Sequence, residues 1–130
     1  MKIGISSTGE DLNSNVDQRF GRCPYFLIVD METMNFEAIP NEKAMASGGA
    51  GIQAAQMLAR AGIKAVITGN AGPNAFRILK SAGIKVVTGV SGTVKEAVEK
   101  YKKGEFQGTD APSVDSHFGM GQGAGSRSDL

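Results

Sequence analysis

The pattern of hydrophobic and polar positions predicts strands in the first third of the chain. Residues 2–6 alternate between apolar and small or polar side chains, and Tyr25–Asp30 is a run of aromatic and β-branched residues. Residues 35–39 alternate again and are closed by Pro40. The last two strands are joined by a short turn, so they must be antiparallel neighbours, because a parallel return needs a crossover of about a dozen residues. We therefore expect a β-meander.

From Ala50 onward the apolar spacing becomes helical. Broad apolar faces predict three helices, and two short apolar runs between them predict strands. The expected elements are a helix over residues 50–61, a strand over 64–68, a helix over 73–82, a strand over 85–88 and a helix over 94–103.

Local signals and an internal repeat support this division. Gly62 and Gly83 are placed to end helices, Pro73 fits a first helical turn, and Thr93 with Glu96 has capping-box spacing. The segment 61–66 matches 82–87 as one helix–glycine–strand unit. Strands separated by such helices run parallel with right-handed crossovers. The expected fold is therefore α/β, with a mixed five-stranded sheet in which the antiparallel meander is followed by αβαβα.

The length of the chain, 130 residues, favours a single domain. Beyond Gly104 large apolar residues become sparse and Gly, Ser and Asp dominate, so this part cannot bury enough surface to offset its ordering entropy. We predict a folded domain over residues 1–106 and a flexible Gly-rich tail over residues 107–130.

Composition and charge exclude several classes of function. Fourteen Lys and Arg against thirteen Asp and Glu leave a net charge of +1, which is too small to drive binding to nucleic acid or anionic lipid. The longest apolar run, Tyr25–Val29, is far shorter than a membrane helix. The single cysteine permits no internal disulfide, and no secretion signal is visible. We expect a cytoplasmic monomer with no nucleic-acid or membrane partner.

Three loops rich in small residues, 46–51, 68–74 and 88–93, each lead into a predicted helix N-terminus. In sheets of this kind such loops meet beyond the carboxyl ends of the strands, and free N–H groups there favour an anion. The alternative is that the glycines only permit tight connections. Asn70 and Asn74 could donate amide hydrogens to a ligand or cap the second helix. The candidate binding residues of the first two loops are Ser47, Gly48, Gly49, Ala50, Gly51, Gly69, Asn70, Gly72 and Asn74.

Arginines and the cysteine beside the second predicted strand add further candidates. Arg19 and Arg22 could pair with an anionic ligand or be solvated at the surface. Cys23 could be a thiolate metal ligand or a small buried hydrophobic residue. One Cys and one His, His117 in the predicted tail, cannot build a structural zinc site.

No known catalytic or nucleotide-binding motif is present. The glycine loops lack the Lys-Ser/Thr of a P-loop and do not follow an opening parallel strand, so nucleotide binding is only an alternative. A hydrolytic triad would need His117 from the predicted flexible tail, and the first strand lacks the acidic residue of two-metal nucleases. We expect a binding protein and not an enzyme.

Three blocks resemble the signature of a known family: residues 17–30, 47–55 and 68–76 are similar to the dinitrogenase iron–molybdenum cofactor biosynthesis domain, the NifX/NifB C-terminal-like domain. The similarity covers residue 1 to about residue 101. It implies a ribonuclease H-like fold and a non-catalytic carrier of an anionic metal–sulfur cluster or nitrogenase-cofactor precursor. The implied bound group is an iron–sulfur or molybdenum–iron–sulfur cluster, with Cys23 as the candidate ligand, and the implied partner is that cluster or its delivery protein.

Two other functions remain open from the sequence. The same loops could bind a small phosphorylated metabolite or a nucleotide without any metal. The Gly-rich tail could instead be the contact segment of a regulatory, partner-binding protein.

Overall fold

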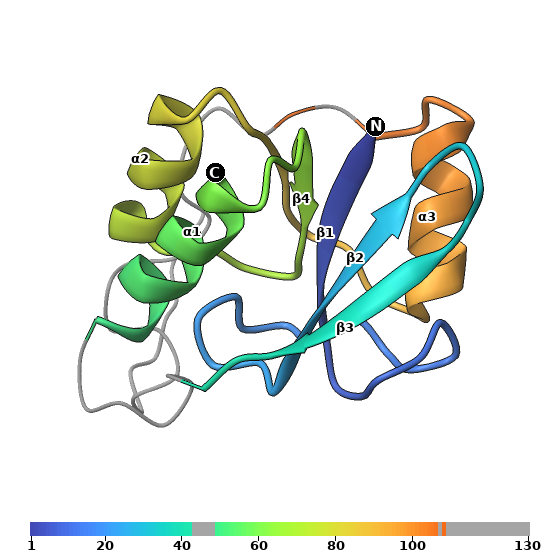
Figure 1. Ribbon diagram of the computed structural model, residues 1–130, viewed down its shortest axis with the longest axis horizontal. Coiled ribbons are helices and arrows are strands. Elements are labelled where there is room, and N and C mark those ends of the chain that lie inside the picture. The colour runs from blue at the N-terminus through green and yellow to red at the C-terminus, as the bar shows by residue number, and fades with distance from the viewer. Residues whose placement is uncertain (43–48, 107, 109–130) are drawn as a thin grey trace.

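A computed structural model describes residues 1–42, 49–106 and 108 of the chain (Figure 1). The candidate residues Ser47 and Gly48, His117 and, apart from Gly108, the predicted tail lie outside the described residues. The expected roles of these residues, and the flexibility of the tail, therefore stay predictions.

The described residues form a mixed five-stranded sheet and three helices, as the sequence predicts. Their boundaries differ from the predicted ones by no more than a residue or two at either end. The elements are β1 (Lys2–Ser7), β2 (Tyr25–Asp30), β3 (Phe36–Pro40), α1 (Ala50–Arg60), β4 (Ala65–Ile67), α2 (Pro73–Ser81), β5 (Lys85–Val87) and α3 (Val94–Lys102).

The strand order in the sheet is β3-β2-β1-β4-β5. β2 is antiparallel to both β1 and β3, which confirms the meander, whereas β1, β4 and β5 run parallel to one another. The carboxyl ends of the three parallel strands therefore lie at one edge of the sheet. Because Tyr25 is paired with Ser7, β2 begins at this same edge.

The two faces of the sheet are covered by different helices. α1 and α2 lie on one face and α3 on the other (Figure 1). The alternation along β2 fits this arrangement, since Phe26 and Ile28 pack into the α1–α2 core and Leu27 and Val29 into the α3 core. α1 connects β3 to β4, and α2 connects β4 to β5. Because β3 is antiparallel to β2, it runs in the same direction as β1, β4 and β5, so α1 and α2 are parallel to each other and both begin at the edge where these strands end.

The local stop and start signals are also confirmed. Gly62 and Gly83 follow α1 and α2 with φ angles of 75° and 78°, the left-handed conformation that glycine adopts most readily. Pro73 occupies the first turn of α2, and Thr93 with Glu96 forms a complete capping box on α3. Across the described residues, no helix has the length and apolar character that crossing a membrane requires.

Candidate functional site

One segment, residues 15–23, crosses the edge of the sheet where the parallel strands end. The backbone N–H of Val16 donates to the carbonyl of Gly92 at 2.8 Å, and that of Phe20 donates to the carbonyl of Asn70 at 3.1 Å. The segment therefore contacts the loops that follow β4 and β5. These hydrogen bonds bring the segment that contains Arg19 and Arg22 beside the loops that follow β4 and β5.

Two glycines are required by close packing within the protein. A Cβ atom on Gly21 would lie 2.7 Å from both Cα and N of Gly51, and one on Gly69 would lie 2.6 Å from Cα of Gln18. Real Cβ atoms essentially never approach backbone atoms so closely, so a side chain at either position requires the backbone to shift. Gly69, predicted as a ligand contact, thus has a packing role against Gln18.

The N-termini of α1 and α2 lie side by side. A Cβ built on Gly51, in the first turn of α1, would be 3.5 Å from Cβ of Ala75 in the first turn of α2. Their N-cap residues, Gly49 and Gly72, supply no side-chain cap, and neither first turn contains an acidic residue. The partial positive charge of both helix ends is therefore not neutralised by their own side chains.

The N-terminus of α3 corrects one expectation. The N–H groups of Val94 and Lys95 donate to the carbonyls of Ser14 and Leu12 at 2.8 and 2.9 Å. The N–H of the third helical residue is taken by the capping-box hydroxyl. Since these donors are already bound by the protein, the loop over residues 88–93 does not join the other two as an anion-binding element.

Arg19 lies at the edge of the site beside Asn70, with which it forms a parallel bridge. Its side chain is 53% exposed, and its Nε lies 3.7 Å from Oδ1 of Asp17. The same oxygen of buried Asp17 accepts the backbone N–H of Arg19 at 2.9 Å. Asp17 therefore balances part of the positive charge of Arg19, while the exposed face of the guanidinium can still reach a ligand. Arg22 is half-buried in the same segment.

The two candidate asparagines have different environments. Asn70 donates from Nδ2 to the carbonyl of Gln18 at 3.2 Å and so holds the crossing segment in place. Asn74 is exposed in the first turn of α2, and its Oδ1 accepts from Arg77 at 3.3 Å. Neither side chain caps α2, so the capping alternative is not supported.

Cys23 is fully buried. Its thiol donates to the carbonyl of Phe20 at 3.3 Å, and burial, together with the negative charge of Asp17, raises its pKa from 9.0 to about 12. A thiol with this pKa is protonated at neutral pH, and metals bind the thiolate. The assignment of Cys23 as a metal ligand stays a prediction, and its burial weighs against it, because the alternative of a small buried hydrophobic residue matches the environment.

Asn41 is a site-forming residue that the sequence analysis missed. It is buried, and its Nδ2 donates to the carbonyls of Gly21 and Cys23 at 3.1 and 2.9 Å. These bonds fix the part of the segment that approaches α1. A single Asn after Pro40 carries no motif, so nothing in the sequence pattern could identify it.

Side-chain ligands for a metal do not gather anywhere in the described part of the chain. No group of three or more His, Cys, Asp or Glu side chains lies close enough there to hold a metal ion. The groups that lie at this edge of the sheet are instead backbone N–H groups, the exposed guanidinium of Arg19 with the half-buried Arg22, and the amides of Asn70 and Asn74.

Comparison with known structures places this fold among related proteins. The apo form of the orange protein from Desulfovibrio gigas is 39% identical, with a TM-score of 0.83 over 86% of this chain and 95% of that chain. A candidate NifB protein from Thermotoga is 40% identical, with a TM-score of 0.72 over 82% of this chain and 91% of that one. A search of curated proteins found no match.

A more distant structure shares the fold alone. It is a candidate dinitrogenase from Methanocaldococcus jannaschii that is 19% identical, with a TM-score of 0.67 over 86% of this chain and 97% of that one. The family model described as dinitrogenase iron-molybdenum cofactor matches residues 1–104, which include all the described elements. The chain therefore belongs to the dinitrogenase iron-molybdenum cofactor family.

Proposed function

We propose that this protein is a non-catalytic carrier of an anionic metal–sulfur cluster or nitrogenase-cofactor precursor, held at the adjacent N-termini of α1 and α2. The observation that carries the proposal is the pairing of two helix ends with neither a side-chain cap nor an acidic residue in the first turn. Two such ends present oriented N–H donors and partial positive charge to one guest. The names of the family and of the NifB-like relative favour a metal–sulfur guest over other anions.

The distribution of charge supports the same guest. Residues 44–95 contain no Asp or Glu but six Lys or Arg, so α1, α2 and the loops that follow them carry only positive formal charge, and the loop before α1 contains one acidic residue, Glu42. A low density of carboxylates avoids repulsion of an anion near the helix ends. Asp17 is the acidic neighbour from the crossing segment, and it is engaged with Arg19.

The cargo is held in this proposal by hydrogen bonds and charge and not by side-chain ligation. The contacts are the backbone N–H groups in the first turns of α1 and α2, except at Pro73, which has no N–H, with Arg19 and Asn74 at the rim. Cys23 contributes packing. A site of this kind can release its guest to a recipient without breaking metal–ligand bonds, which suits a carrier. We also interpret the mixed sheet as ribonuclease H-like and residues 1–106 as the binding domain.

The test is anaerobic reconstitution with iron, sulfide and molybdate, followed by absorbance and elemental analysis of the desalted protein. Asn74→Asp is the informative variant, because it keeps the shape of the side chain and adds a negative charge to the first turn of α2. We expect cargo affinity to fall about two- to fivefold, since a charge in a first helical turn is worth about 0.3–1 kcal/mol.

The matched control is Asn35→Asp, which makes the same exchange in the turn after β2 at the opposite end of the sheet. It should load like the wild type. A protein that stays colourless and free of metal, or equal loss in both variants, would remove the proposal. If instead the protein takes up no metal, while inorganic phosphate in metal-free buffer raises the melting temperature and Asn74→Asp weakens this effect, the site binds phosphorylated metabolites and the carrier function is wrong.

A further inference from the structure

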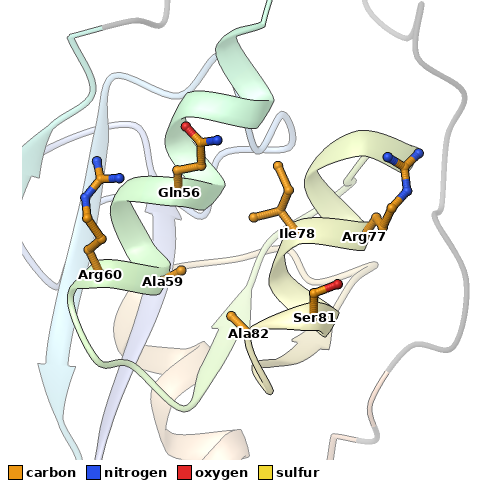
Figure 2. A pocket seen from close by; sticks show the side chains of 7 residues that line it. All are labelled: Gln56, Ala59, Arg60, Arg77, Ile78, Ser81 and Ala82. Carbon is orange, nitrogen blue, oxygen red and sulfur yellow. The ribbon is translucent and has the colours of Figure 1, made fainter.

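A groove on the outer surface of α1 and α2 lies apart from the proposed cargo site. It has a volume of about 580 Å³ and is lined by the second half of α1 and by α2 with the residue after it (Figure 2). Because the two helices are parallel, this groove lies toward their C-terminal ends, whereas the cargo site lies at their N-termini. The lining residues are Gln56, Ala59, Arg60, Arg77, Ile78, Ser81 and Ala82.

The groove combines an apolar floor with a cationic rim. Ala59, Ile78 and Ala82 supply the apolar surface, while Arg60 and Arg77 lie on opposite sides of it (Figure 2). Both arginines are exposed, and neither forms an ion pair with any of the described residues. Arg77 donates a hydrogen bond to Oδ1 of Asn74 at 3.3 Å.

The charges on the two helices that form the groove have one sign only. The charged residues of α1 and α2 are Arg60, Arg77 and Lys80, and the whole sequence from residue 44 to residue 95 contains no Asp or Glu. An incoming carboxylate therefore meets no repelling group from either helix. Surfaces of opposite charge attract and orient partners through such fields.

We propose that this groove docks an acidic, amphipathic segment of a partner protein. The separation of the two guanidinium groups across the groove favours an extended or helical segment that places a carboxylate on each side and an apolar side chain between them. A single small anion would use one arginine and leave the floor uncovered. A net charge of +1 for the whole chain and the apolar floor favour a polypeptide over nucleic acid or an anionic membrane. The inference goes beyond the proposed carrier function, because it gives the protein a second binding surface, which adjoins the rim of the cargo site through the hydrogen bond between Arg77 and Asn74.

The experiment measures binding of a fluorescent amphipathic peptide with glutamates on both sides of a leucine stripe to the full-length chain. The same peptide with glutamines in place of the glutamates is the probe control. Saturable binding of the acidic peptide that weakens with added salt is expected, with little binding of the glutamine peptide.

Two variants test the location. Gln56→Glu keeps the side-chain shape and places a carboxylate four residues before Arg60, and Arg60→Gln removes the charge. Each should weaken peptide binding about two- to fivefold, the range expected of one exposed charge pair. Lys95→Gln, which removes an exposed cation from α3 on the other face of the sheet, should leave binding unchanged. Cargo loading of Gln56→Glu should match the wild type, so failure of docking and failure of the carrier function are distinguishable.

Several results would overturn the proposal. These are absence of acidic-peptide binding, equal binding of the glutamine peptide, and equal weakening by Lys95→Gln. The proposal is also wrong if a single-stranded oligonucleotide or vesicles of anionic lipid compete as strongly as unlabelled acidic peptide. Equally strong competition by a peptide of residues 109–130 would make the chain's own segment the occupant.

Discussion

The backbone of Gly21 packs directly against that of Gly51, so closely that a Cβ on Gly21 would lie 2.7 Å from two backbone atoms of its neighbour. This contact joins the segment before β2 to the first turn of α1. It therefore fixes the position of one of the two helix ends that form the proposed cargo site. The contact is between residues thirty positions apart, so only the folded sheet brings them together.

Gly21→Ala should lower the stability of the protein and displace the N-terminus of α1 at the proposed cargo site, because the added methyl group fits only if the backbone moves. We expect unfolding in urea to require about 1–3 kcal/mol less free energy, the usual range for overpacking. Gly51→Ala is the matched control, since its Cβ would meet only Cβ of Ala75 at an ordinary 3.5 Å. Inside a helix this exchange should be neutral or stabilising by up to about 1 kcal/mol. Equal destabilisation by both variants would contradict the packing argument.

Removal of the Asn41 side chain should loosen the same segment. Asn41→Ala would leave the carbonyls of Gly21 and Cys23 without their buried donor, and we expect a loss of about 1–3 kcal/mol in the free energy of unfolding. Asn35→Ala, which truncates an exposed asparagine, should change stability little. Chemical denaturation of both variants measures the difference, and an Asn41→Ala protein as stable as the control would show that these hydrogen bonds contribute nothing.

Most of the fold could be predicted because its signals are local. The apolar periodicity gives each element, the repeat over residues 61–66 and 82–87 gives the parallel half, and Gly62 and Gly83 mark helix ends by their conformation. The antiparallel pairing of β2 with β3 follows from the short turn alone. These features agree with one another, which is why the predicted boundaries are close to the observed ones.

The site could be predicted only in part, because its decisive contacts are long-range. The sequence indicates which loops lead into helices, but it cannot show that Ser14 and Leu12 occupy the N–H groups of α3. Nor can it show that Gln18 fills the space beside Gly69, or that the side chain of Cys23 is fully buried. Each of these facts depends on where residues 12–23 pass over the sheet, and that segment has no periodic pattern.

The buried thiol of Cys23 should react slowly in the native protein. At pH 8 it is protonated and enclosed, so alkylation by iodoacetamide should proceed at a rate limited by opening of the fold and accelerate strongly in denaturant. Mass spectrometry of the protein sampled over time measures the extent of modification. Rapid modification in native buffer at the rate of a small-molecule thiol would mean that Cys23 is accessible, and would restore it as a candidate ligand.

The same thiol should make stability fall at alkaline pH. Well below pH 9 the thiol is protonated in both the folded and unfolded states and contributes no pH dependence. Between pH 9.0 and about 12 only the unfolded thiol ionises, so the free energy of unfolding should decrease, with a slope of at most about 1.4 kcal/mol per pH unit. Cys23→Ala lacks this group and retains the tyrosines and lysines, so the difference between the two pH profiles isolates the thiol. Parallel profiles would contradict the raised pKa.

The capping box of α3 allows the roles of the three helix ends to be separated. Thr93→Ala removes the hydroxyl that accepts the N–H of Glu96 at 3.1 Å, and should lower the free energy of unfolding by about 1 kcal/mol. Cargo loading should be unaffected, because the first N–H groups of α3 are bound to Ser14 and Leu12 and face no guest. Asn74→Asp should have the opposite profile, with weaker loading and an unchanged or slightly higher melting temperature, since an acidic residue suits the first turn of a helix. Reconstitution and thermal unfolding of the two variants side by side measure both effects. Weaker loading in Thr93→Ala would mean that the N-terminus of α3 does contribute to cargo binding, contrary to the argument above.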